Sequence, residues 1–424
     1  MTRYRVVWAL FLIALLGALG TGRDLLWATA GSLLALILIA VGWAWLGVNW
    51  LRISRRTFAR TAQVGQVLEE EFKLANLSRL PKLWVEVHDL STLPGHAASR
   101  VVGLLGGHQW RGWRVRTVCT QRGRYALGPL VVSSGDPLGV YQLRRRVGSV
   151  HALLVYPLTF ELARFPLPAA ISTGGEALYR RTHHVTPNAA GLRDYISGDS
   201  INRIHWPTSI RRQRLTVKEF ELDPVADAWI AVDLWAGGHF GRQDFETAPA
   251  AATVETLLPA SSEEYAIAIA ASVVQHLAQR GRAVGLIAHE AHRLVIPAER
   301  SERQLNKVME ALAVARAVGT IPFDGLLRME ATLLRRGSSL VAISAWPEPS
   351  WAIPIQQIAR GGVRVVAIVI DGQSFGAAQS SEAVITALAN AGAIVRVVRC
   401  GQSIPLALES EPAHARQQVR GTAL

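Results

Sequence analysis

The segment that decides the fold of the C-terminal half is VRVVAIVI, residues Val363–Ile370. It is a nearly continuous apolar run, as a parallel strand buried on both faces requires. Four similar runs occupy Trp229–Val232, Ala283–Ala288, Leu340–Ser344 and Ile394–Val398. Amphipathic helices are predicted between them, at Ser262–Arg280, Ser301–Val318 and Asp324–Arg336. Alternating strands and helices predict an open, doubly wound α/β domain over residues 225–405.

Residues 61–157 show a different pattern. Short alternating segments, such as Leu83–Val87 and Arg114–Val118, are separated by turn signals rich in glycine and proline. Period-2 alternation is typical of strands with one buried face, so we expect a β-sandwich-like domain. Residues 158–190, which contain Pro166 and Pro168, are predicted to be a surface linker. Residues 406–424 are predicted to be a disordered tail.

Residues 1–60 are predicted to be a membrane anchor. Apolar runs at 6–22 and 25–51 are separated only by Gly20–Asp24. As helices they would be about 25 Å and 40 Å long, enough to reach across a hydrocarbon layer about 30 Å thick. We therefore expect two transmembrane helices that form a hairpin.

The orientation of the hairpin follows from its flanking arginines, which are Arg3 and Arg5 before it and Arg52, Arg55, Arg56 and Arg60 after it. The positive-inside rule places both ends of the anchor, and the domains that follow, in the cytoplasm. The alternative is a signal peptide, for which Ala18–Gly20 is a poor cleavage site. In that case too, the arginines after residue 51 hold the rest of the chain inside.

The formal net charge of the 424 residues is +13, and the chain has two cysteines, Cys119 and Cys400. Two distant cysteines support neither a disulfide framework nor a zinc site, and they suit a reducing compartment. A basic balance fits nucleic acid, an anionic membrane surface or an acidic partner. Arg144–Arg146 and Arg211–Arg214 lie in no recognisable nucleic-acid motif, so no nucleic-acid partner is expected.

The densest motif lies in residues 191–224, where GLRDYISGD (191–199) is followed by NRIHW (202–206), TSIR (208–211) and VKEFE (217–221). This order resembles the domain of unknown function 58 (DUF 58) family, as do Arg122–Pro129 and Asp136–Gly139 upstream. Asn202 and Ile210 depart from the family's usual arginine and alanine. The candidate protein-binding or structural residues are Arg193, Tyr195, Gly198, Asp199, Arg203, Trp206, Arg211, Lys218 and Glu219.

Three interpretations of this motif remain open. Arginine–carboxylate pairs are bidentate, so the motif can lock a surface loop against the sheet domain. Arginine and tryptophan are also enriched at interface hot spots, so it can instead be a docking face. A hydrolase site near Asp199 and His205 is the third interpretation.

The resemblance further implies a C-terminal domain similar to the von Willebrand factor type A domain. Such domains often hold magnesium through Asp-x-Ser-x-Ser after the first strand. Here Asp233 is present, but Trp235 and Gly237 occupy the serine positions. Because magnesium needs several hard oxygen ligands, we predict no metal and no cofactor, with Asp233 as a weak candidate ligand. His183-His184 and His289–His292 are interpreted as ordinary surface residues.

These patterns predict a non-catalytic, membrane-anchored interaction or scaffold protein of the cell membrane, not an enzyme. The resemblance implies a MoxR-type AAA+ ATPase as partner, acting with this chain in assembly or maturation of a client protein complex. A metal-dependent adhesion module and an uncharacterised hydrolase are the alternatives.

Overall fold

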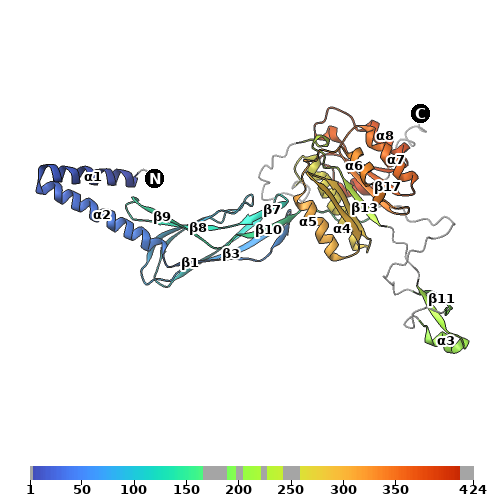
Figure 1. Ribbon diagram of the computed structural model, residues 1–424, viewed down its shortest axis with the longest axis horizontal. Coiled ribbons are helices and arrows are strands. Elements are labelled where there is room, and N and C mark those ends of the chain that lie inside the picture. The colour runs from blue at the N-terminus through green and yellow to red at the C-terminus, as the bar shows by residue number, and fades with distance from the viewer. Residues whose placement is uncertain (1–2, 166–188, 197–203, 221–226, 242–257, 411–424) are drawn as a thin grey trace.

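A computed structural model describes residues 3–165, 189–196, 204–220, 227–241 and 258–410. Figure 1 shows two long helices at one end, an elongated β-region beside them, and a compact α/β region beyond it. The predicted order of an apolar helical pair, a sheet-rich middle and an α/β region is confirmed.

The first two helices are α1 (Arg3–Thr21) and α2 (Asp24–Val48), and both are long and apolar enough to cross a membrane. The predicted end of the second apolar helix at residue 51 is wrong. Asn49 stops α2 by turning its backbone N–H and its side-chain amide onto the carbonyl of Trp45. Trp50 then takes a φ of 58°, and Leu51 already begins the first strand. The β-region therefore starts at residue 51 and not at residue 61.

The β-region holds three sheets. The first has the order β1 (Leu51–Thr57), β3 (Val67–Asn76) and β6 (Trp110–Val118), and the second has β5 (Arg100–Leu105), β4 (Lys82–Asp89), β8 (Leu130–Gly135) and β9 (Gln142–Val147). The third joins β2 (Thr61–Gln63), β10 (His151–Tyr156) and β7 (Gly123–Leu127). Inward side chains of the first two sheets share one apolar core, in which Phe72 stacks on Trp113 at 5.4 Å. The predicted alternation is confirmed in β4 and β6.

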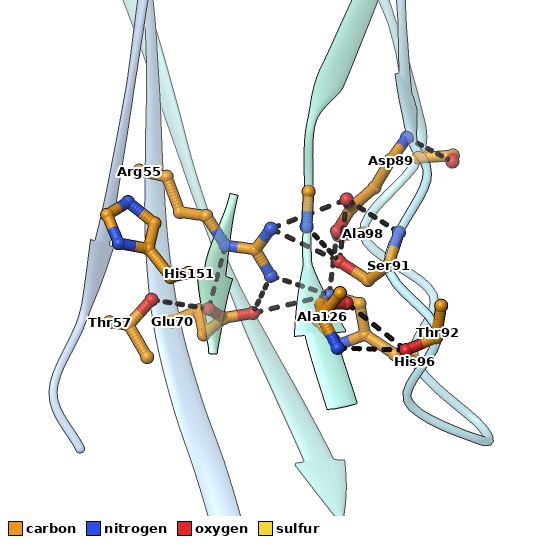
Figure 2. A network of polar contacts seen from close by, with 12 residues as sticks. Arg55, Thr57, Glu70, Asp89, Ser91, Thr92, His96, Ala98, Ala126 and His151 are labelled. Carbon is orange, nitrogen blue, oxygen red and sulfur yellow. Dashed lines mark hydrogen bonds and ion pairs between the residues drawn. The ribbon is translucent and has the colours of Figure 1, made fainter. Parts of the chain in front are cut away.

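A buried polar network ties these two sheets together (Figure 2). Arg55 of β1 donates twice to Glu70 of β3, at 2.8 and 2.7 Å, and reaches Asp89 at the end of β4 at 3.4 Å. His96 places Nε2 2.9 Å from Asp89 and 3.2 Å from Glu70. Burial raises the pKa of Asp89, but hydrogen bonds from His96 and Ser91 and the charge of Arg55 outweigh it and hold that pKa below its usual value. Arg55 is therefore a buried structural residue, and its charge is not free in the way expected of an arginine that flanks the predicted membrane anchor.

The α/β region contains a six-stranded sheet. Its order is β15 (Arg293–Glu299), β14 (Val284–His289), β13 (Ala228–Val232), β16 (Ser339–Ser344), β17 (Arg364–Ile370) and β18 (Ile394–Val398). All neighbours pair in parallel except β15, which pairs antiparallel with β14. The five predicted strands are confirmed, whereas β15 was not predicted, so the sheet is mixed.

Helices cover both faces of this sheet. On one face lie α4 (Ser262–Gln279), α5 (Glu302–Val314) and α9 (Ile404–Glu409). On the other lie α6 (Phe323–Glu330), α7 (Ala352–Arg360) and α8 (Glu382–Asn390). The predicted helix 324–336 is shorter in the structure, because the chain passes into a 3₁₀ turn at Ala331–Leu333.

Two boundary predictions need correction. Leu158, Leu162 and Phe165 are buried, so the first part of the predicted linker belongs to the core, while 166–188 lies outside the described residues. The predicted tail is also wrong as far as Glu409, because α9 buries Ile404 and Leu408 against the sheet. Residues 411–424 lie outside the described residues.

A buried arginine lies where the β-region and the α/β region meet. Arg122, which precedes β7, donates to Glu264, and to Glu263 at 3.0 Å, both on α4. It also donates to the carbonyls of Leu312 and Ala315 at the end of α5, at 3.2 and 2.7 Å. A planar guanidinium with five donors can satisfy several acceptors at once, so this single side chain fixes both helix ends to the β-region.

Candidate functional site

Most of the residues singled out in the sequence lie in a small lobe, here called the motif lobe, whose described residues are 189–196 and 204–220. It consists of β11 (Ala189–Asp194), α3 (Trp206–Arg212) and β12 (Thr216–Phe220). The two strands pair antiparallel, so Arg193 lies opposite Val217, and Lys218 and Glu219 follow on the neighbouring strand. Figure 1 shows β11 and α3 standing apart from the mixed sheet.

Helix α3 is held by polar contacts to the strand that follows it. The hydroxyl of Ser209 donates to the carbonyl of His205 at 3.0 Å and accepts from the N–H of Thr216 at 2.9 Å. Ile204 and Val217 are buried beneath it. Gln213, with a φ of 53°, ends the helix in the left-handed conformation. The lobe therefore has a small core of its own.

The outer face of α3 is apolar and basic. Trp206 is 56% exposed and Ile210 is 74% exposed, and Leu215 just beyond the helix is also exposed. Arg211 and Arg212 occupy the last turn and are exposed. Among the described residues, neither forms an ion pair. Large apolar side chains beside unpaired arginines are typical of the centre and rim of a protein interface.

The structure locates only some of the predicted motif residues. Tyr195 is half-buried and donates its backbone N–H to the carbonyl of Leu215 at 2.9 Å, while Trp206 and Arg211 lie on the exposed face. Gly198, Asp199 and Arg203 lie outside the described residues, as do the side chains of Arg193, Lys218 and Glu219. Their predicted roles remain predictions, and so does the hydrolase reading of Asp199 with His205.

One ion pair in the lobe was not anticipated. Arg214 Nη1 lies 3.0 Å from Asp194 Oδ2, and both side chains are more than half exposed. This pair joins β11 to the turn before β12 within the lobe. Arg214 is not one of the arginines on which the locking interpretation rests, so that interpretation stays a prediction.

A second candidate is the carboxyl edge of the mixed sheet, where Asp233 follows β13. Its Oδ2 accepts from the Ser344 hydroxyl at 2.6 Å, and its Oδ1 accepts from the backbone N–H of Trp235 at 3.0 Å. The residue is 1% exposed, and burial raises the pKa of its carboxyl group. His239 Nε2 donates to the Asp233 carbonyl at 2.8 Å, which closes the loop above the strand. Both carboxylate oxygens are thus engaged inside the protein.

The side chains around Asp233 do not fit a magnesium site. Trp235 packs edge-on against Trp346 at 4.7 Å, at positions where hard oxygen ligands would be needed. Asp371, after β17, accepts from Ser381 at 2.9 Å and faces Arg399 at 3.3 Å. Within the described ranges, no three His, Cys, Asp or Glu side chains cluster as metal ligands would.

Of the histidine candidates, the structure describes His289 and His292. His183-His184 lies outside the described residues. His289 ends β14, and its Nδ1 is buried without a hydrogen-bond partner. The turn that contains His292 is exposed at the sheet edge.

Comparison with known families matches residues 191–374 to the family described as "Protein of unknown function DUF58". The matched range includes the motif lobe and the mixed sheet through β17. A curated relative, the "Uncharacterized protein YeaD" of Bacillus subtilis (strain 168), is 21% identical over 284 residues. The match covers 66% of this chain and 64% of the relative, so it spans less than two thirds of the relative's length.

Solved structures give weaker likenesses. The conserved hypothetical protein BatB of Bacteroides thetaiotaomicron is 12% identical, with a TM-score of 0.28 over 46% of this chain and 96% of that one. The pilus adhesin SpaC of Lactobacillus rhamnosus GG, in its open conformation, is 10% identical, with a TM-score of 0.30 over 46% and 30%. These scores are below 0.5 and establish no shared fold. The family match and the Bacillus relative, by contrast, support the assignment of this chain to the DUF58 family of proteins of unknown function.

Proposed function

We propose that this chain is a non-catalytic, membrane-anchored interaction protein whose motif lobe docks a partner protein. The observation that carries the proposal is the outer face of α3, where Trp206 and Ile210 are exposed beside Arg211 and Arg212. Leaving such apolar groups in water is unfavourable, at about 25 cal/mol per Å² of apolar surface, and a partner that covers them recovers that free energy.

The chemistry of this face also describes the partner. Two exposed guanidiniums that form no ion pair with a described residue favour a partner surface that carries carboxylates around an apolar pocket. The family resemblance suggests a MoxR-type AAA+ ATPase for this role. On this proposal the mixed sheet is a type A-like module that presents a client complex to the ATPase for assembly or maturation.

Anchoring by α1 and α2 is supported by their length and apolar surface. Figure 1 shows the pair at the far end of the β-region from the α/β region. The arginines on both outer sides of the hairpin favour an orientation with the domains in the cytoplasm. The motif lobe and the mixed sheet would then face the cytoplasm, where an ATPase finds its nucleotide.

The engaged state of Asp233 supports a non-catalytic role for the sheet edge. A general acid, base or metal ligand must lie within reach of its substrate or ion, and Asp233 is 1% exposed. Both oxygens of this carboxylate already accept hydrogen bonds from Ser344 and Trp235.

The test is affinity purification of the full-length chain from gently solubilised membranes, with Trp206→Ala as the decisive variant. If Trp206 is a hot spot, its removal costs about 2 kcal/mol or more of binding free energy, which corresponds to roughly a thirtyfold weaker complex. The ATPase should be recovered with the wild type and lost with the variant.

The matched control is Ile353→Ala, since Ile353 is also 56% exposed but lies on α7 of the α/β region. It should leave recovery unchanged, and neither variant should alter the thermal unfolding midpoint. Equal recovery with wild type and Trp206→Ala would refute the docking face. Failure to recover any AAA+ ATPase with wild type would refute the proposed partner.

A further inference from the structure

We propose that the end of the β-region next to α2 is itself a membrane-contacting surface, which seats apolar side chains in the lipid headgroup layer and binds anionic headgroups. This inference rests on the proposed membrane anchoring. It concerns the tips of three loops and not the helices: the β3–β4 loop (77–81), the β5–β6 loop (106–109) and the β8–β9 turn (136–141), here called the anchor-end loops.

Strand register brings the anchor-end loops to one end of the β-region. Leu51, the first residue after the anchor, pairs with Asn76 at the end of β3. Lys82 at the start of β4 pairs with Leu105 at the end of β5. Since β8 runs antiparallel to β4, its end and the following turn lie at the same end as Lys82. The chain therefore enters the β-region at the end where all three loops reverse.

Direct contacts hold the first two loops to each other and to Trp50, in the short junction that follows α2. The N–H of Leu77 donates to the carbonyl of Trp50 at 2.8 Å, and the N–H of His108 donates to the carbonyl of Ser78 at 3.0 Å. Buried Asn76 donates its amide to the carbonyls of Leu80 and Gly106, at 2.8 and 3.0 Å. The loops are thus fixed in place beside the apolar helix.

Lys82 and the β8–β9 turn make further contacts to the helical pair. The ammonium of Lys82 donates to the carbonyl of Leu46 in the last turn of α2, where a cation complements the helix dipole. On the other side, Trp8 of α1 donates its indole N–H to the hydroxyl of Tyr141. Both helices therefore lead directly to this surface.

The tips of these loops expose large apolar side chains. Leu80 is 55% exposed on the β3–β4 loop, and Leu138 is 64% exposed on the β8–β9 turn. Beside them lie exposed Trp50 and Trp110, the latter at the start of β6. Indole rings favour the membrane–water interface, and leucines on turn tips can enter it without exposing strand edges. Exposure to water alone would not favour so many large apolar side chains at one end of the β-region.

Basic side chains surround these apolar groups. Arg52, Arg79 and Arg111 are exposed, and none forms an ion pair with a described residue. Lys73 places its ammonium 4.3 Å from the ring centre of Trp110. Cationic side chains within a Debye length of an anionic leaflet are attracted to its headgroups. These basic side chains therefore favour an anionic lipid surface, and not an apolar protein surface, as the partner of the anchor-end loops.

The experiment uses the full-length chain with Cys400→Ser, in nanodiscs of phosphatidylcholine and phosphatidylglycerol. Burial of the remaining Cys119 raises the pKa of its thiol to about 11, so this residue should not react with the label. An environment-sensitive fluorophore is attached at Leu80→Cys or Leu138→Cys. We expect blue-shifted emission that is quenched by lipids carrying a nitroxide near the headgroup.

Two labelled controls separate the possible failures. Leu38→Cys lies near the middle of α2 and should be quenched by lipids that carry the nitroxide on the acyl chain, whereas Ile353→Cys lies on α7 and should be quenched by neither lipid. Quenching at residue 38 without quenching at 80 and 138 would overturn this inference and leave the anchor intact. If the emission at residues 80 and 138 is blue-shifted but not quenched, protein and not lipid covers these loops. No quenching at residue 38 would overturn the membrane anchoring, and this inference with it.

The headgroup part of the inference has its own test. Arg79→Glu combined with Arg111→Glu should reduce quenching at residue 80 in discs that contain phosphatidylglycerol. In discs of phosphatidylcholine alone the loss should be smaller, since no anionic headgroup then repels the new carboxylates. Equal quenching of the double variant and its parent in anionic discs would overturn the role of charge.

Discussion

The junction of the two large regions and the motif lobe use arginine in opposite ways. Arg122 at the junction is 2% exposed and bonds to two carboxylates and two carbonyls. In the motif lobe, Arg211 and Arg212 are exposed, and Arg214 makes one exposed ion pair. The first arginine is used entirely within the molecule, whereas Arg211 and Arg212 form no ion pair with a described residue.

This difference shows that the burial of each arginine, and not the total count of arginines in the chain, decides what the side chain does. A buried guanidinium must have every acceptor supplied by the fold, because an unpaired buried charge is strongly unfavourable. An exposed one is solvated by water and costs little to leave without a partner. The net charge of the chain therefore says less about partners than the exposed guanidiniums do.

The largest effect is expected for Arg122→Ala. The change leaves Glu263 and Glu264 buried without their main counter-charge, and breaking a buried pair in this way costs about 3–5 kcal/mol of unfolding free energy. Denaturant unfolding of the full-length chain in detergent should show the loss, and limited proteolysis should cut near the junction. A loss no greater than that of an exposed arginine would contradict the comparison.

The same variant should depend on pH in a defined direction. Burial raises the pKa of Glu264 above its ordinary 4.5, and Arg122 lowers it in opposition. Without Arg122 this pKa rises further. The stability contributed by protonated Glu264 is then complete below about 4.5 and is lost as pH rises through the folded-state pKa. The variant should therefore recover stability as the pH falls from 7 towards 5, and Arg122→Ala with Glu264→Gln should show less of this recovery.

An intermediate effect is expected for Asp233→Ala, because this buried carboxyl group is satisfied by neutral donors. The change leaves the hydroxyl of Ser344 and the N–H of Trp235 without their acceptor, at a cost of about 1–3 kcal/mol of unfolding free energy. Asp233→Asn, which keeps one acceptor oxygen, should lose less. Thermal unfolding with and without magnesium checks both points. A magnesium-dependent midpoint in the wild type that disappears in Asp233→Ala would contradict the prediction that no metal binds there.

The smallest effect is expected for Arg214→Ala. Its pair with Asp194 is exposed on both sides, and such pairs contribute less than about 1 kcal/mol to unfolding free energy. Partner binding should weaken only slightly, because the apolar face of α3 is kept. Loss of stability similar to that of Arg122→Ala would show that the lobe is held by its charges.

Sequence reasoning predicted best the elements that carry a strong local pattern. The runs that became β13, β16 and β17 are almost entirely apolar because both faces of the sheet are covered. The edge strand β15 escaped notice, since it contains Pro297 and has a charged residue at each end, Arg293 and Glu299. The end of α2 was placed too late, because the change at Asn49 and Trp50 depends on backbone conformation and not on hydropathy.

The contacts that matter most at the candidate sites could not be predicted. Arg122 belongs to a recognised motif, but its partners Glu263 and Glu264 lie more than 140 residues away in the chain. Asp233 was singled out from the sequence only as a weak candidate ligand in a degraded motif, and its bond to Ser344 depends on how β13 and β16 pair. The exposure of Trp206 is likewise a property of the folded lobe. The sequence indicated which residues were candidates, and the packing of the fold determined which contacts they make.

The short passage from α2 into β1 has a mechanical consequence. Only Asn49 and Trp50 separate helix from strand, and Lys82 ties the last helical turn to β4. No slack segment intervenes there, and Arg122 joins the far end of the β-region to the α/β region. A partner that pulls on the mixed sheet would therefore transmit its force through the β-region to the apolar helices.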